Sequence, residues 1–263
     1  MSKYSQVFLT DKRVCAKIVS ALDGEKFESL VEIGPGRGAL TKFLYPKYGP
    51  RLKAVEIDPE MAEFLRRKYQ GLALINRDFL ELDLAAETGG AKTAFIGNLP
   101  YSCSTAILER VLDLENLVVA VFMFQKEVAR RLTAERGSHD YGYLSIAAQA
   151  RAGITMLADV GSASFSPVPE VDSSVLILRP RRIFSGAELE KELFSLLKSA
   201  FTHRRKTLVN SLALSGRFSK AAVEEALSKI ALEPGVRPQE LSPEDYLKLM
   251  ACLRGCFFKR RIK

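Results

Sequence analysis

One stretch of this sequence has residue types suited to binding and activating an amine: asparagine, leucine, proline and tyrosine at positions 98–101. They follow the apolar run 93–97 and therefore stand where a buried strand is expected to end. There, a side-chain amide oxygen and a main-chain carbonyl could both accept N–H bonds from the exocyclic amine of a nucleobase, while a tyrosine ring stacks on the base. Accepting both bonds draws the nitrogen towards a tetrahedral shape and frees its lone pair for attack. Candidate catalytic residues are therefore Asn98, Leu99, Pro100 and Tyr101; the alternative is a strand followed by an ordinary Pro-Tyr turn.

Three earlier apolar runs also lead into residues that suit a ligand containing adenosine. The first passes into the glycine turn 34–38, where the backbone can approach a ligand beside a helix N-terminus. The second carries Glu56, about twenty residues after the glycines, where an acid can accept both ribose hydroxyls. The third precedes Asp78, which is placed to accept from an adenine amine. Because the carboxyl ends of parallel strands share one edge of a sheet, these residues predict a single crevice.

The glycine turn alone does not identify the cofactor. A dinucleotide would share the glycines, but Pro35 removes a backbone donor from the turn and Ala39 breaks the GxGxxG spacing. No partner for hydride transfer is evident either. A cofactor without a pyrophosphate fits better, and S-adenosylmethionine is such a molecule.

Composition narrows the class of protein. The 263 residues are 47% hydrophobic, which is enough for a large packed core. No apolar run approaches the roughly 20 residues that span a bilayer, and the first residues lack the apolar centre of a signal peptide, so we expect a cytoplasmic protein without membrane contact. Four scattered cysteines and two histidines give no zinc-like spacing. We therefore expect reduced thiols and no metal site.

Charge and periodicity divide the chain near residue 182. Residues 183–263 hold 15 Lys and Arg against 9 Asp and Glu, whereas residues 1–182 hold 24 against 22. From Glu188 onward the apolar spacing is helical only. The sequence predicts an α/β domain at 1–182, with an N-terminal arm at 1–11, and a smaller all-helical domain at 183–263. A basic domain attached to a nearly neutral one is typical of nucleic-acid binding, although a solvated basic surface is the alternative.

Several motifs together resemble the ribosomal RNA adenine dimethyltransferases, and the resemblance extends from Gln6 into the C-terminal region. It implies a Rossmann-like S-adenosylmethionine-dependent methyltransferase domain followed by a helical domain. The long C-terminal match favours the enzymes that act on small-subunit ribosomal RNA over those that act on large-subunit RNA. The matching residues are Gln6-x-Phe8-Leu9, Val31-Glu32-Ile33-Gly34-Pro35-Gly36-x-Gly38, Val55-Glu56-x-Asp58, Asn98-Leu99-Pro100-Tyr101, Gln125-Lys126-Glu127-Val128-Ala129, Tyr141-Gly142-x-Leu144-Ser145, Phe165-x-Pro167-x-Pro169-x-Val171-Asp172-Ser173, Arg204-Arg205-Lys206-Thr207-Leu208 and Arg237-Pro238-Gln239-Glu240-Leu241-Ser242.

The resemblance assigns roles to individual residues. Phe165 would pack on the target base opposite Tyr101, unless its ring instead fills the core of its own domain. Val7 is a departure, because family members usually have Asn or His there, and only a main-chain contact is expected at that position. The cofactor-binding residues implied are Val7, Leu9, Gly34, Gly36, Glu56, Asp78 and Asn98, and the RNA-binding residues are Arg204, Arg205 and Lys206.

The expected reaction is transfer of methyl groups to N6 of adenosines in small-subunit ribosomal RNA, giving N6,N6-dimethyladenosine during ribosome maturation. The chain is expected to act as a monomer on the RNA or on a precursor of the small subunit. Two other classes stay open. One is a non-catalytic ribosome-assembly or RNA-binding factor on the same fold, for which the altered arm is the only indication. The other is methylation of DNA or of a protein amide, against which Leu99 argues because those enzymes have proline at that position.

Overall fold

The computed structural model describes residues 7–203 and 205–257. Its contacts divide the chain into two compact units, Met1–Ala129 with Gly153–Pro180 and Arg130–Ala152 with Arg181–Lys263. The division after Pro180 lies close to the expected boundary at residue 182. The segment 130–152, expected in the first domain, belongs instead to the second unit.

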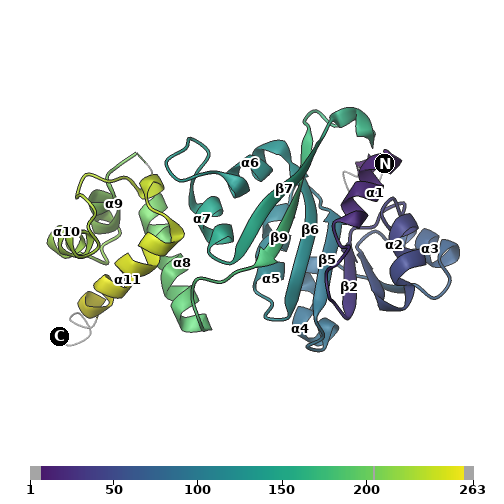
Figure 1. The fold of residues 1–263 in the computed structure, drawn as a ribbon, viewed down its shortest axis with the longest axis horizontal. Coiled ribbons are helices and arrows are strands. Elements are labelled where there is room, and N and C mark those ends of the chain that lie inside the picture. The colour runs from purple at the N-terminus through teal and green to yellow at the C-terminus, as the bar shows by residue number, and fades with distance from the viewer. Residues whose placement is uncertain (1–6, 204, 258–263) are drawn as a thin grey trace. The chain divides into compact units, whose positions relative to one another are not determined.

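The first unit is built on one seven-stranded sheet, in the order β4-β3-β2-β5-β6-β9-β7. The pairs from β4 to β6 are all parallel, and β9 is antiparallel to β6. Figure 1 shows the labelled strands β7, β9, β6, β5 and β2 following one another across this sheet. The strands are β2 (Ser29–Ile33), β3 (Leu52–Glu56), β4 (Ala73–Asn76), β5 (Thr93–Asn98), β6 (Leu117–Gln125), β7 (Ala152–Val160) and β9 (Ser173–Pro180); two further strands, β1 (Phe8–Leu9) and β8 (Phe165–Ser166), form a separate antiparallel pair.

Strand order places the two main motifs together. From β2 the chain adds β3 and β4 on one side, and it then returns to add β5 and β6 on the other side. The glycine turn after β2 and Asn98 at the end of β5 therefore flank the point where the strand order reverses. Open α/β sheets bind ligands at such a point, outside the carboxyl ends of the strands.

The continuous apolar sequence of β6 reflects burial on both faces. Val119, Val121 and Met123 belong to a core cluster that also contains Ile18 of helix α1 (Lys12–Ser20). The residues that alternate with them are equally buried, so the strand is covered on both sides, as expected for an interior strand of a parallel sheet. By contrast, β7 is an edge strand with several exposed residues.

Acidic caps begin several helices of the first unit. The Asp11 side chain accepts from two backbone N–H groups at the start of α1, and Asp58 does the same for α3, where Pro59 takes the first helical position. The helices of this unit are α1 (Lys12–Ser20), α2 (Thr41–Tyr48), α3 (Pro59–Lys68), α4 (Leu84–Thr88) and α5 (Ser104–Leu112), with short 3-10 turns η1 (Gly49–Arg51), η2 (Phe79–Glu81) and η3 (Ser162–Ser164); α6 (Lys126–Thr133) contains the division between the units.

Among the described residues, the second unit contains helices and no strand apart from Ala152, which begins β7, as the sequence predicts for its C-terminal part. The segment 130–152 joins it because Tyr141 and Ile146 are buried in the same apolar cluster as the C-terminal helices. The Tyr141 hydroxyl donates to Leu241 O at 3.0 Å, which ties the two stretches of chain together. The helices are α7 (Tyr143–Gln149), α8 (Ala187–Phe201), α9 (Leu208–Leu214), α10 (Lys220–Lys229) and α11 (Pro243–Phe257), with the short turn η4 (Pro238–Glu240).

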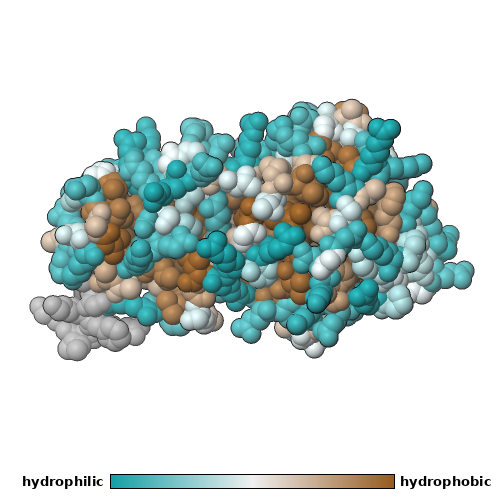
Figure 2. All heavy atoms as spheres, viewed as in Figure 1, coloured by the Kyte–Doolittle hydropathy of each residue, from teal (hydrophilic) through white to brown (hydrophobic). Residues whose placement is uncertain are grey.

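Hydrophilic residues cover most of the face shown in Figure 2, and hydrophobic residues gather in separate patches. Val168 and Val171 are exposed on the loop that follows Phe165, so this loop presents apolar side chains to solvent. Within the described ranges, no helix combines the length and the apolar character needed to cross a membrane.

Candidate active site

The Glu56 carboxylate is hydrogen-bonded to the glycine turn 34–38. One oxygen of the Glu56 carboxylate accepts from Gly36 N at 2.8 Å, and the other accepts from Asp58 N at 2.9 Å. Gly34 and Gly36 both have positive φ, 63° and 53°, which side-chain-bearing residues rarely adopt. The turn that follows β2 and the acid at the end of β3 are therefore one connected structure, as the strand-end argument predicts.

Burial raises the pKa of Glu56, while the hydrogen bonds from Asp58 and Gly36 act in the opposite direction. The residue as a whole is only 3% exposed. Each of its oxygens has one backbone donor and retains acceptor capacity for a second. This acceptor pair could accept from the two ribose hydroxyls of S-adenosylmethionine.

Asp78 stands at the start of η2, where one side-chain oxygen accepts from Leu80 N at 2.8 Å. The Arg110 guanidinium of α5 donates to the carbonyls of Phe79, Leu80 and Leu82 and holds this turn in place. Burial, and after it the charge of Asp78, raises the pKa of the Cys103 thiol. The turn that begins at Asp78 is therefore held against α5, and the second oxygen of Asp78 could accept from an adenine amine.

The N-terminal arm reaches both Asn98 and the glycine turn. Asn98 Nδ2 donates to Val7 O at 3.2 Å, across 91 residues of sequence. The Phe8 ring packs on Gly36 so closely that a Cβ there would lie 2.9 Å from it, and the Arg37 guanidinium lies 4.6 Å from the ring centre. At position 7 the observed contact to Asn98 is made by the main chain, so the side-chain type matters little for it. Leu9 is buried in the core, which leaves its backbone as the part that could meet a cofactor.

The segment after Asn98 is arranged as a turn into α5. Leu99 is buried and its N–H donates to Met123 O at 3.4 Å. Pro100 is exposed, and its carbonyl accepts from Cys103 N at 3.2 Å. The Tyr101 hydroxyl lies 2.7 Å from Ser173 Oγ, and its ring is half-buried. Pro100 O is thus engaged in the turn, which favours Leu99 O of the two carbonyls as an acceptor for a substrate amine.

Phe165 lies in the core of the first unit. The residue is 3% exposed and belongs to the same apolar cluster as Leu9, with which it pairs in the β1–β8 ladder. This is the core alternative that the sequence left open. A contact between Phe165 and a target base stays a prediction, and it requires the ring to turn outward.

The basic run predicted to bind RNA lies between α8 and α9. Arg205 and Lys206 are exposed, and Lys206 N donates to His203 O at 2.9 Å. Arg204 lies outside the described residues.

Glu32 is a buried acid that the sequence argument left without a role. It is 1% exposed inside β2, and Thr41 Oγ1 of α2 donates to its Oε2 at 2.8 Å, so it links the two elements that flank the glycine turn. Burial raises the pKa of Glu32 from its ordinary 4.5 to about 8; Thr41 opposes this and the charge of Glu56 adds to it. An acid within an otherwise apolar strand is the sequence signal that could have found it. Arg110, which holds the turn after Asp78, has no comparable signal in the sequence.

We expect Glu32→Gln to change how stability depends on pH. The unfolded chain ionises this carboxyl above pH 4.5, whereas the folded chain keeps it protonated to about pH 8. Wild-type stability therefore falls between these pH values, by up to about 1.4 kcal/mol per pH unit, while glutamine does not titrate. Urea unfolding at pH 5, 7 and 9 should show that the free energy of unfolding of the variant increases relative to that of the wild type as pH rises. A difference that stays constant with pH would contradict this assignment.

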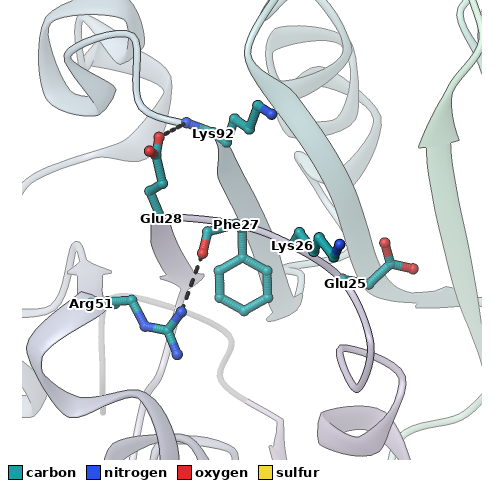
Figure 3. Close-up of a pocket in the computed structure, with 6 residues that line it drawn as sticks. All are labelled: Glu25, Lys26, Phe27, Glu28, Arg51 and Lys92. Atoms are coloured by element: carbon teal, nitrogen blue, oxygen red, sulfur yellow. Dashed lines mark hydrogen bonds between the residues drawn. The ribbon is translucent and has the colours of Figure 1, made fainter.

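A separate pocket of about 380 Å³ lies at the amino ends of the strands (Figure 3). Glu28, Arg51 and Lys92 each stand immediately before one of the strands β2, β3 and β5. Figure 3 shows Glu28 bonded to the backbone of Lys92, and Arg51 bonded to the carbonyl of Phe27. This pocket is therefore remote from Glu56 and Asn98, which stand at the carboxyl ends of their strands.

The sheet order, the glycine turn and the polar groups at successive strand ends define a Rossmann-like methyltransferase that uses S-adenosylmethionine. The family model described as "Ribosomal RNA adenine dimethylase" matches residues 1–254, and the chain belongs to that family.

Similar proteins span almost the same length. "Ribosomal RNA small subunit methyltransferase A" of Coxiella burnetii (strain RSA 493 / Nine Mile phase I) is 39% identical over 252 residues, covering 94% of this chain and 95% of the relative. The protein of the same name from Chlorobium phaeobacteroides (strain BS1) is 37% identical over 253 residues, covering 96% and 93%. Among solved structures, the 23S rRNA methyltransferase ErmE is 28% identical with a TM-score of 0.72, covering 94% of this chain and 99% of that one. A dimethyladenosine transferase from Plasmodium falciparum, 24% identical with a TM-score of 0.77 and coverages of 94% and 98%, shares the fold.

Proposed function

We propose that this chain methylates N6 of adenosines in small-subunit ribosomal RNA, in two rounds that give N6,N6-dimethyladenosine, during maturation of the small subunit. The family supplies the reaction class, and the names of the full-length relatives from two organisms support the small-subunit substrate. The observation that carries the catalytic assignment is the orientation of Asn98, whose amide nitrogen is bound to Val7 O. That bond leaves the amide oxygen as the end available to a substrate.

In this proposal S-adenosylmethionine would be held by Glu56 at its ribose, by Asp78 at its adenine amine and by Asn98 beside its methyl group. Gly34, Gly36 and the backbone of Val7 and Leu9 line the same place. S-adenosylmethionine supplies an electrophilic methyl group on a sulfonium centre.

The residues of this chain then shape the nucleophile. Asn98 Oδ1 and Leu99 O accept the two N–H bonds of the target amine, which frees the nitrogen lone pair, and Tyr101 stacks on the base. With the cofactor bound, the N6 lone pair would take the methyl group, the electron pair of the sulfur–carbon bond would leave with S-adenosylhomocysteine, and the N6 proton would pass to water. No strong general base is required, and none of the groups at the strand ends needs to act as one. Since a target base must leave any stack it occupies, at a cost of a few kcal/mol, a loop adenosine is favoured.

The altered arm does not favour the assembly-factor alternative, because the contact found at position 7 uses the backbone.

The proposed reaction is tested by incubating the protein with labelled S-adenosylmethionine and undermethylated small subunits, with large-subunit RNA in parallel, and by analysing the digested RNA. Dimethyladenosine from small subunits is the expected product. Labelling of large-subunit RNA alone, or no labelling together with no cofactor binding, would overturn the proposal. Sedimentation analysis would test the proposal that the cytoplasmic enzyme is a monomer.

Neutralising the basic run 204–206 is expected to weaken RNA binding and to reduce its dependence on salt. Each phosphate contact removed should lower the slope of log affinity against log salt by about 1. Arg205→Gln with Lys206→Gln tests the two described members of the run by titration with small-subunit RNA from low to high salt. Lys229→Gln, which removes another exposed cation in the same unit, is the control. An unchanged slope would exclude Arg205 and Lys206 from the interface.

A further inference from the structure

Ser173 ends the motif that begins at Phe165, and nothing in the proposed reaction uses it. Its hydroxyl lies 2.7 Å from that of Tyr101, 72 residues away. Ser173 is fully buried, whereas Tyr101 is partly exposed. We propose that Ser173 is a positioning residue that fixes the Tyr101 ring on which the target adenine stacks. This inference rests on the proposed function, because the stacking role of Tyr101 is part of it.

Ser173 is itself held firmly. It is the first residue of β9 and pairs with Gln125 at the end of β6. Next to it, Asp172 O accepts from Lys126 N at 2.9 Å, and the Asp172 carboxylate accepts from Ser162 N at 3.0 Å. The hydroxyl therefore projects from a rigid point of the sheet and offers Tyr101 a fixed partner.

Tyr101 needs such a partner, because the other hydrogen bonds found at positions 99–101 hold only the backbone. Leu99 N donates to Met123 O, and Pro100, which has no N–H, can only accept. Ser104 Oγ donates to Tyr101 O at 3.4 Å. In the part of the chain that the structure describes, the hydrogen bond that acts on the Tyr101 side chain is the one to Ser173.

Loss of this bond should act on stacking, because stacking depends on the offset and tilt of the two rings. A tyrosine ring turns about two side-chain torsions, and one hydrogen bond at its far end restricts both. We expect removal of the bond to reduce kcat for methyl transfer by about tenfold, which corresponds to about 1.4 kcal/mol.

The experiment is a double-mutant cycle with Ser173→Ala, Tyr101→Phe and the double variant. Methyl transfer is measured at saturating S-adenosylmethionine with undermethylated small subunits as substrate. Each single variant should lose about tenfold in kcat, and the double variant should lose no more, because both changes remove the same bond. Affinity for S-adenosylhomocysteine should stay at the wild-type value, since the glycine turn and Glu56 are untouched. If Ser173→Ala does not fold, Tyr101→Phe still removes the bond from the more exposed partner.

Ser174→Ala is the matched control. Ser174 is equally buried and its hydroxyl also makes a side-chain hydrogen bond, but to Asp159 Oδ1 at 2.6 Å. Wild-type kcat is expected for this variant. The inference is overturned if Ser173→Ala keeps the wild-type rate, if the losses at 101 and 173 add, or if Ser174→Ala loses as much as Ser173→Ala. A wild-type protein that transfers no methyl group would instead overturn the proposed function, and the role of Ser173 with it.

Discussion

Asn98→Ala is expected to abolish methyl transfer while leaving the fold intact. The variant lacks the amide oxygen that accepts from the target amine, and loss of one such preorganised group costs on the order of 10²- to 10³-fold in rate. Asn98 is only half-buried, and its side chain makes one neutral hydrogen bond to Val7 O, so the cost in stability should be about 1 kcal/mol. Single-turnover transfer at saturating S-adenosylmethionine measures the chemical step, and urea unfolding measures stability.

Asn116→Ala is a suitable control for this variant. Asn116 also donates its side-chain amide to a backbone carbonyl, that of Ala91, but it stands before β6, at the amino end of the strand. It should retain wild-type turnover while losing similar stability. Turnover in Asn98→Ala within a few-fold of the wild type would refute the role given to Asn98.

The second large effect is expected on cofactor binding. Glu56→Ala removes a carboxylate whose hydrogen bonds to ribose hydroxyls would be charge-assisted, and we expect affinity for S-adenosylhomocysteine to fall by about 10- to 100-fold. The change also leaves the buried N–H groups of Gly36 and Asp58 without their acceptor, at about 1–3 kcal/mol each. Titration calorimetry gives the affinity, and it should be run at a temperature where urea unfolding shows the variant to be folded.

Glu63→Ala separates this local effect from loss of negative charge in general. Glu63 lies on α3, a few residues beyond Glu56, and it is half exposed and paired with Arg67. Its removal should leave cofactor affinity unchanged. An unaltered affinity in a folded Glu56→Ala variant would show that the ribose is bound elsewhere.

The sequence by itself determined which residues stand at the carboxyl ends of neighbouring strands. Gly34, Glu56 and Asn98 each follow or end an apolar run, and parallel strands bring the ends of such runs to one edge of the sheet whatever the connections between them. Local capping chemistry also set several boundaries, such as the start of α3 at Asp58 and Pro59. These features depend on neighbouring residues or on a repeat of side chains along one strand, so they are readable without the fold.

Only the tertiary structure decided what lies across from these residues. Val7 and Asn98 are hydrogen-bonded although 91 residues separate them in the sequence, and Ser173 and Tyr101 are hydrogen-bonded across 72 residues. No local sequence pattern encodes either contact. The burial of Phe165 depends on pairing with the arm, and the placement of 130–152 in the second unit depends on a helical core built from residues far along the chain. Local sequence determines where each strand ends. The partner of each side chain depends on how distant elements pack, because packing energy depends on the whole set of surfaces that are buried together.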